Sequence, residues 1–279
     1  MTAAPIGIFD SGLGGLSVWK EVVKLLPYRS VVYLSDNAFC PYGRRRAEEL
    51  VERTQQVVRF LLHEACQMVV VACNTATAAA IDSLRASYPV PFVGMEPAVK
   101  PAALHSQTGV VGILATHGTF QGRLYQETSH RFASHVRIIE QVGDGLVELI
   151  EQGLCEAPQT IQLLHRYINP MIEAGADHLV LGCTHYPFLI PVIEKISDGR
   201  LTIIDPAPAV AHHVYTLLEQ NYFSQEALER GGQPHTYRFY ATGSAAALEA
   251  CFRTLVPPKT SAQFFPFFEF PENYYLRRV

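Results

Sequence analysis

Residues 68–75 of the chain read Met-Val-Val-Val-Ala-Cys-Asn-Thr. The apolar run before the cysteine is the pattern of a β-strand that is covered on both faces, as the strands of a parallel sheet are. The Ala-rich stretch that follows predicts a helix over residues 76–86. A buried strand that passes through a short polar segment into a helix is the repeating unit of an α/β protein.

The same pattern extends along the chain on both sides of this stretch. Strands that alternate with helices favour parallel βαβ units in an α/β sheet. In the first half, strands are expected at 6–9 and 31–34, and helices at 16–26 and 46–65. In the second half, strands are expected at 109–114 and 178–182, with helices near 121–130 and after Pro187.

The two halves also share the chemistry of their strand ends. Each has a hydroxyl-bearing loop after its first strand, at Ser11 and at Thr116. Each then has a strand that ends at a cysteine, followed by Asn-Thr at Cys73 and by Thr-His at Cys183. This looks like a degenerate internal duplication. We therefore predict an α/β fold of two similar parallel-sheet domains related by pseudo-symmetry, with the active site in the cleft between them.

Proline-rich segments indicate where the chain passes from one domain to the other. Pro89, Pro91, Pro97 and Pro101 bracket the first passage, and Asp205-Pro206-Ala207-Pro208 marks the second. The segment after residue 208 predicts a helix to about 220, a strand at 236–240 and a helix at 245–255. We expect it to return and complete the first domain. The predicted domains are therefore 1–96 plus 208–279, and 97–207.

The composition excludes several classes of protein. With 48% hydrophobic and 17% charged residues, the chain of 279 residues is neither disordered nor fibrous. A net charge of −4 is too mild for a nucleic-acid partner. No apolar run is long enough to span a bilayer, and residues 1–8 do not have the pattern of a signal peptide. We expect a cytoplasmic protein, without a membrane partner, whose six cysteines stay reduced.

Ligands of open parallel sheets bind outside the carboxyl ends of the strands. The helices expected there would direct backbone N–H groups and positive dipole ends toward an anion such as a carboxylate. The same field is predicted to lower the pKa of a cysteine at this edge. The polar side chains and thiols expected at these strand ends are Asp10, Ser11, Cys73, Asn74, Thr75, Thr116, Cys183, Thr184 and His185.

A cysteine at a strand end is usually a small buried residue. Two cysteines in matching places suit a different role: one thiol removes a proton from one face of a carbon, and the other delivers a proton to the opposite face. Cys40, Cys66, Cys155 and Cys251 lack this context and are expected only to pack. The spacings contain no CxxC pair, so no metal site is predicted.

Other residues allow two interpretations each. The loop Asp10-Ser11-Gly12-Leu13-Gly14-Gly15 lacks both the GxGxxG spacing and the Walker lysine, so its glycines are expected to allow close approach of a ligand rather than to bind a nucleotide. Tyr42-Gly43 is either a turn or part of a ligand site, and His185 is either structural or involved in proton transfer. Glu148 and Glu151 lie on a predicted helix whose default environment is solvent.

A family resemblance rests on six stretches: FDSGLGGLSV (9–18), PYG (41–43), VVACNTATA (70–78), ATHGT (115–119), LVELIEQG (146–153) and LGCTHYPFL (181–189). Through nearly its whole length the chain resembles the glutamate racemases of the cofactor-independent aspartate/glutamate racemase family. The resemblance implies reversible interconversion of L- and D-glutamate, which supplies D-glutamate for bacterial peptidoglycan. It implies neither pyridoxal phosphate nor a metal.

The resemblance also implies roles for individual residues. Cys73 would remove the α-proton of D-glutamate and Cys183 that of L-glutamate. Asp10 would assist near Cys73, and His185 with Glu151 would assist near Cys183. The substrate-binding positions that the resemblance implies are Asp10, Ser11, Tyr42, Gly43, Asn74, Thr75, Thr184 and His185, with Thr116 and Thr119 as additions.

Three other functions remain open. A racemase of aspartate or of a hydantoin would share the paired thiols but bind a different side chain. A non-catalytic amino-acid-binding module would use the cleft without exchange of the α-proton. A thiol redox enzyme is a third alternative, although the chain lacks the CxxC motif. A homodimer is one possible assembly.

Overall fold

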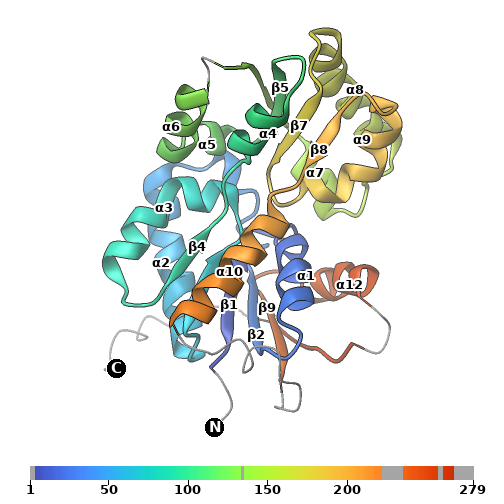
Figure 1. The fold of residues 1–279 in the computed structure, drawn as a ribbon. Helices are drawn as coiled ribbons and strands as arrows, with labels where there is room; N and C mark the ends of the chain where they lie inside the picture. The colour runs from blue at the N-terminus through green and yellow to red at the C-terminus, as the bar shows by residue number, and fades with distance from the viewer. Residues whose placement is uncertain (1–3, 133–134, 222–234, 257–259, 267–279) are drawn as a thin grey trace.

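The fold of the chain was obtained as a computed structural model, which describes residues 4–132, 135–221, 235–256 and 260–266. It contains two β-sheets whose paired strands all run parallel. Figure 1 shows the two sheets one above the other, each with helices around it. The prediction of an α/β fold built on two parallel-sheet units is confirmed.

The first sheet has six strands in the order β10-β9-β2-β1-β3-β4. Ile8 of β1 is paired with Tyr33 of β2 on one side and with Val70 of β3 on the other. The strands are β1 (Ile6–Asp10), β2 (Val31–Ser35), β3 (Met68–Val71), β4 (Phe92–Gly94), β9 (Tyr237–Ala241) and β10 (Gln263–Pro266).

The second sheet has four strands in the order β6-β5-β7-β8. They are β5 (Val110–Ala115), β6 (Arg137–Val142), β7 (His178–Gly182) and β8 (Thr202–Ile204). In chain order, both this sheet and the β2-β1-β3-β4 part of the first sheet run second, first, third, fourth. The shared order is the structural form of the internal duplication that the sequence predicts.

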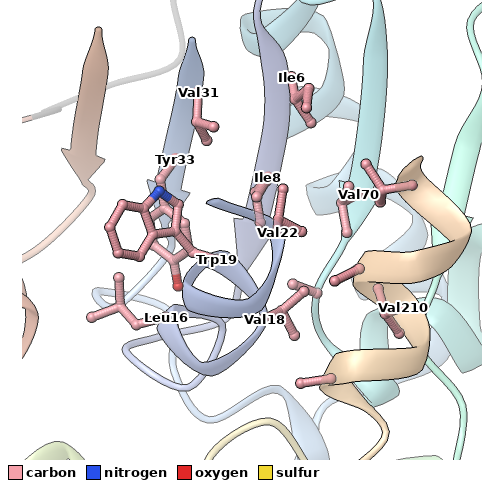
Figure 2. Packing of buried hydrophobic residues seen from close by; sticks show 14 of the residues in the cluster. Ile6, Ile8, Leu16, Val18, Trp19, Val22, Val31, Tyr33, Val70 and Val210 are labelled. Carbon is pink, nitrogen blue, oxygen red and sulfur yellow. The ribbon is translucent and has the colours of Figure 1, made fainter. Parts of the chain in front are cut away.

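Both faces of the central strands β1, β2 and β3 are buried, which explains their continuous apolar runs. Ile8 and Val70 face the helices α1 (Leu16–Leu25), α10 (Ala207–Asn221) and α12 (Ala245–Leu255). Phe9 and Val71 face α2 (Ala47–His63) and α3 (Asn74–Ser87) on the other side. Figure 2 shows Trp19 of α1 lying beside Tyr33 of β2 within this core.

The second sheet is covered in the same way. Leu114 and Leu181 pack against α7 (Leu146–Glu151), α8 (Pro158–Glu173) and α9 (Ile190–Ser197). Ile113 and Val180 pack against α4 (Val99–His105) and α6 (Arg123–Phe132). The remaining short elements are η1 (Tyr42–Arg44), α5 (His117–Phe120) and η2 (Tyr186–Leu189).

The segment after residue 208 contributes to the first sheet, because β9 pairs along its whole length with β2. Helix α10 lies beside α1 in Figure 1, and both contribute to the same core. The exact domain boundaries, 1–96 plus 208–279 and 97–207, stay a prediction, and part of the C-terminal segment lies outside the described residues. None of the helices in the described part of the chain has the length and hydropathy of a bilayer-spanning segment.

Candidate active site

The two thiols singled out by the sequence occupy equivalent positions. Cys73 follows β3, the third strand of the first sheet, and Cys183 follows β7, the third strand of the second sheet. Only 4% of Cys73 and 6% of Cys183 is exposed. The cysteines are therefore at the strand ends that the sequence predicts, and the protein closes over them.

Cys73 is the N-cap residue of α3, and its sulfur accepts a hydrogen bond from the backbone N–H of Ala76 at 3.5 Å. Its thiol donates to the hydroxyl of Ser11, with 3.7 Å between Sγ and Oγ. Burial and the nearby carboxyl group of Asp10 raise the pKa of Cys73 well above its usual range. The hydrogen bonds with Ala76 and Ser11 act in the opposite direction but are weaker.

This raised pKa corrects one expectation. The sequence predicts that the helix N-terminus lowers the pKa of a cysteine at the strand end and so provides a thiolate. For Cys73 the prediction is wrong, because full burial beside Asp10 outweighs the N–H groups of α3. After Cys183 the chain first forms η2 and then enters α9 at Ile190, which confirms the helix expected after Pro187.

Asp10 is fully buried at the end of β1, and it organises the glycine-rich loop. Its Oδ2 accepts backbone hydrogen bonds from Gly12 at 3.1 Å and from Gly15 at 3.0 Å. Its Oδ1 accepts from the hydroxyl of Thr184 at 3.2 Å, so this one carboxyl group connects strand ends of both sheets. Burial raises the pKa of Asp10, while His185 and the two amides oppose the increase.

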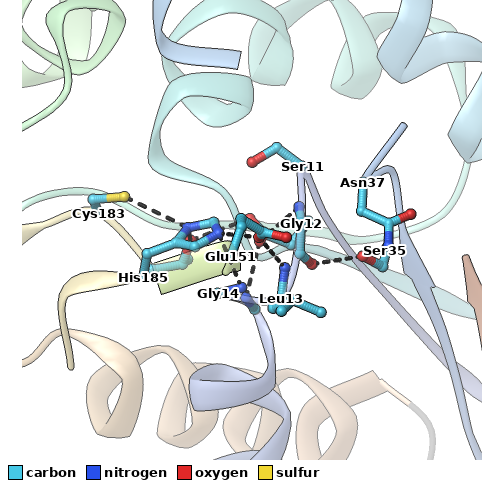
Figure 3. Close-up of polar contacts among 12 residues, drawn as sticks. Ser11, Gly12, Leu13, Gly14, Ser35, Asn37, Glu151, Cys183 and His185 are labelled. Atoms are coloured by element: carbon cyan, nitrogen blue, oxygen red, sulfur yellow. Dashed lines mark hydrogen bonds and ion pairs between the residues drawn. The ribbon is translucent and has the colours of Figure 1, made fainter. Parts of the chain in front are cut away.

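Beside Cys183, His185 and Glu151 form a hydrogen-bonded pair, shown in Figure 3. His185 Nδ1 lies 3.8 Å from Cys183 Sγ, and Nε2 lies 2.6 Å from Glu151 Oε1. The same Glu151 oxygen accepts the backbone N–H of Leu13 at 2.6 Å. Glu151 therefore faces the site rather than solvent, and His185, only 1% exposed, is held between the carboxylate and the thiol.

Burial by itself would lower the pKa of His185, but its hydrogen bonds with Cys183, Cys40 and Glu151 raise that pKa well above the usual value. An imidazolium with Glu151 on one nitrogen can donate a proton toward Cys183 from the other. Gly14 leaves the space for this ring, because a Cβ at Gly14 would lie 2.3 Å from His185 Nδ1 and 2.6 Å from Thr184 Oγ1.

Sequence reasoning missed Cys40, which was expected only to pack. Its thiol lies against His185, and ligand atoms of Cys40, Glu151 and His185 all lie within 4.8 Å of one another. No local signal marks Cys40, because its partners come from segments that are distant in the sequence. Only the folding of the chain brings these three residues together.

A chain of hydroxyl groups connects the two sheets on the other side of the site. Thr75 Oγ1 is 2.8 Å from Thr116 Oγ1, which is 2.8 Å from Thr119 Oγ1. Thr119 in turn donates to the carbonyl oxygen of Gly182, just before Cys183. Asn74 donates to the carbonyl oxygen of Met95, whereas its buried Oδ1 has no hydrogen-bond partner among the described residues.

The Tyr42-Gly43 segment lies at the edge of this arrangement. The Tyr42 hydroxyl donates to Asp36 Oδ2 at 2.6 Å, and burial together with Asp36 raises the pKa of the phenol well above its usual value. Gly43 lies against Thr116, whose Cβ would be 3.0 Å from a Cβ at this glycine. The segment is therefore packed into the site's surroundings, and its contact with a substrate stays a prediction.

Two buried thiols at equivalent strand ends, each with its own hydrogen-bonding partners, suit proton transfer at both faces of one carbon atom. A profile of the Asp/Glu/hydantoin racemase family matches residues 6–214. The chain belongs to the Asp/Glu/hydantoin racemase family. As a member of this racemase family it is an isomerase.

Known proteins of this racemase family match over most of the chain. The glutamate racemase of Stutzerimonas stutzeri is 42% identical over 265 residues, which are 95% of this chain and 98% of the relative. A crystal structure of glutamate racemase from Francisella tularensis in complex with D-glutamate has a TM-score of 0.78 at 27% identity, and the match covers 93% of this chain and 96% of that one. Escherichia coli glutamate racemase, in complex with L-glutamate and the activator UDP-MurNAc-ala, has a TM-score of 0.78 at 31% identity and coverage of 91% and 96%.

Proposed function

We propose that this chain interconverts L- and D-glutamate by proton transfer at the α-carbon, with Cys73 and Cys183 as the two proton donors and acceptors. The observation that carries the proposal is the equivalent placement of two buried thiols after the third strand of each sheet. The relatives of known name that cover most of the chain support glutamate as the substrate.

The two thiols have different hydrogen-bonding partners. The raised pKa of Cys73 keeps its proton at neutral pH, so that thiol is ready to deliver a proton. Cys183 lies 3.8 Å from Nδ1 of His185, and this imidazole can exchange a proton with the thiol. With these partners, Cys183 would remove the α-proton of L-glutamate and Cys73 would reprotonate the carbon from the opposite face.

Removal of the α-proton places negative charge on the substrate, and the protein must stabilise that charge. The N–H groups of the first turn of α3 and the hydroxyl of Thr75 provide donors for carboxylate oxygens. The unpartnered Oδ1 of Asn74 provides an acceptor for the substrate's ammonium group. These donors and this acceptor would bind the carboxylate and the ammonium group of an amino acid.

Because both thiols are nearly buried, substrate entry requires the two sheets with their loops to move apart. Closing again would exclude water and hold the α-carbon between the sulfur atoms. We place the reaction in the cytoplasm, where its D-glutamate would be incorporated into peptidoglycan, and we propose a homodimer as the assembly. Sedimentation velocity tests that last point, because a monomer at the concentration of the assay would exclude it.

Deuterium exchange distinguishes two bases from one. In D₂O, the product enantiomer formed early in the reaction should carry deuterium at the α-carbon, while the unreacted substrate keeps protium. A single base would instead return the original proton or label both enantiomers. Cys73→Ala and Cys183→Ala should each lower the rate of racemisation by at least about 10²-fold. Cys155→Ala is the control, and full turnover by either of the first two variants would contradict the mechanism.

The choice of substrate is tested separately. Racemisation of glutamate and of aspartate, each followed by loss of circular dichroism without added cofactor, separates this proposal from an aspartate racemase. A non-catalytic binding module would bind glutamate without any deuterium uptake.

A further inference from the structure

We propose that Cys40, Glu151 and His185 form a binding site for a borderline-soft divalent cation such as Zn²⁺, and that a cation bound there inhibits the reaction. Binding does not depend on the proposed racemase activity, whereas inhibition does. The site departs from the expectation of no metal, which was based on the spacing of cysteines along the sequence. Its three ligands come from three separate segments.

The three donor atoms already lie close together. All pairs are within 4.8 Å, and His185 Nε2 is 2.6 Å from Glu151 Oε1. Ligands of a tetrahedral zinc ion bind at about 2.0 to 2.3 Å, so small side-chain rotations are enough to surround one ion. Gly12 makes the cluster possible, because a Cβ there would lie 2.0 Å from Glu151 Oε1 and 3.1 Å from Cys40 Sγ.

The donor set is one that zinc favours. A thiolate, an imidazole nitrogen and a carboxylate oxygen are all common zinc ligands, and three protein ligands leave a fourth position for water. Glu151 Oε1 now accepts hydrogen bonds from Leu13 N–H and from His185, and a cation bound to this oxygen would take the place of the contact with His185. Thiolate and carboxylate together balance the charge of a divalent ion. The Cys40 thiol and the His185 imidazolium each release a proton to solvent when the ion binds.

The cation would connect the two halves of the protein. Cys40 lies in the loop after β2 of the first sheet, whereas Glu151 ends α7 and His185 follows β7 of the second. A metal bound to all three therefore joins loops that must separate when substrate enters. It also removes the His185–Glu151 hydrogen bond beside Cys183. Both effects predict slower racemisation.

The experiment compares metal binding by the wild type and four variants, with activity as a second measurement. The fully reduced chain is titrated with Co²⁺, whose thiolate-to-metal charge-transfer absorption reports coordination by cysteine, and then with Zn²⁺ in competition. The variants are Cys40→Ala and Glu151→Gln, which remove ligands, Cys155→Ala as a matched thiol control, and Cys73→Ala. Circular dichroism establishes that each variant is folded, and each rate is normalised to the same variant without metal.

We expect the wild type, Cys155→Ala and Cys73→Ala to bind a single Co²⁺ with a charge-transfer band. Cys40→Ala should lose that band, and both ligand variants should bind Zn²⁺ more than about tenfold more weakly. Zinc should inhibit the wild type and Cys155→Ala, but not Cys40→Ala at the same concentration. If Cys40→Ala keeps the band and the affinity, or if Cys73→Ala loses them, the metal is bound by other thiols and the proposal is wrong. Binding as expected without racemase activity would instead refute the proposed function.

Discussion

The hydroxyl oxygens of Thr75 and Thr116 lie 2.8 Å apart, so the first turn of α3 is hydrogen-bonded to the loop after β5. This contact joins the strand-end loops of the two sheets close to Cys73. Thr116 is also the N-cap of α5, where its side chain accepts the backbone N–H of Thr119. One hydroxyl therefore contributes both to local helix structure and to the closed arrangement of the site.

Thr116→Val should weaken this arrangement, because valine has a similar shape but no hydroxyl. Loss of the cap costs about 1 kcal/mol of stability, and loss of the contact with Thr75 should raise the KM for glutamate several-fold. Thr116→Ser restores the hydroxyl and should restore both values. Steady-state kinetics and thermal unfolding of both variants measure the KM and the stability. A Thr116→Val enzyme with the wild-type KM would show that the contact has no part in substrate binding.

Gly14→Ala should damage the site rather than the fold. The new Cβ would meet His185 Nδ1 at 2.3 Å and Thr184 Oγ1 at 2.6 Å, so both side chains must move. Displacement of a group involved in proton transfer lowers the rate by about 10²-fold or more. Gly199→Ala is the contrasting control: nothing lies within 4 Å of its Cβ, but its φ of 72° strains alanine by about 1 kcal/mol. It should lower Tm and leave kcat unchanged, and the same pattern in Gly14→Ala would contradict the prediction.

Arg53→Met should destabilise the first domain strongly. Arg53 makes two hydrogen bonds to the fully buried carboxylate of Asp36, at 2.8 Å from Nε and 2.6 Å from Nη2. Removing the cation leaves that carboxylate buried without its charge partner, which costs about 3–5 kcal/mol. Chemical denaturation measures the loss. Arg53→Lys keeps the charge without the planar fork and should cost less; equal losses in the two variants would show that charge is not the main contribution.

The charge of Asp177 makes the stability of the folded protein depend on pH. Burial works to raise its pKa, but hydrogen bonds from His178, Thr108, Ser106 and Gln107 outweigh burial and hold that pKa well below the usual range. A carboxyl group with a lowered folded-state pKa stabilises the protein above its ordinary pKa of about 3.9. This contribution is lost as the pH falls below that value.

Asp177→Asn should therefore cost about 1 kcal/mol near neutral pH, a value that allows for solvent screening at this partly exposed site. The difference in Tm from the wild type should narrow as the pH is lowered below about 4. Thermal unfolding of both proteins between neutral and acidic pH measures this difference in Tm. A constant difference over that range would mean that the charge of Asp177 is not what stabilises the loop.

The sequence predicts the elements that carry the site, because these are the most buried. Strands β1, β3, β5 and β7 were all expected, and their apolar runs are fully or almost fully buried in the structure. The sequence does not predict β4 and β8, since each has only three residues and shows no periodicity. Strand β6 was also missed: it is an edge strand with half-exposed and exposed residues, so its sequence lacks a continuous apolar run.

Helix α8 could have been found from sequence. Its buried residues include Leu164, Ile168 and Met171, which recur at helical spacing after Pro158 at the first position. The location of Cys40 and the raised pKa of Cys73 could not have been predicted from the sequence. Both depend on which side chains of the other segments surround the thiol, and local sequence contains no information about that.

The pairing of β9 with β2 has a consequence for synthesis of the chain on the ribosome. The second sheet is encoded without interruption between residues 110 and 204, whereas β2 acquires its outer neighbour only when residues 237–241 emerge. Until then, β2 presents a bare edge, and Trp19 lacks the aromatic cover of Phe239 and Phe252. The half of the protein that is made first is thus finished last. Premature termination upstream of residue 237 would release a chain with an apolar strand edge that favours aggregation.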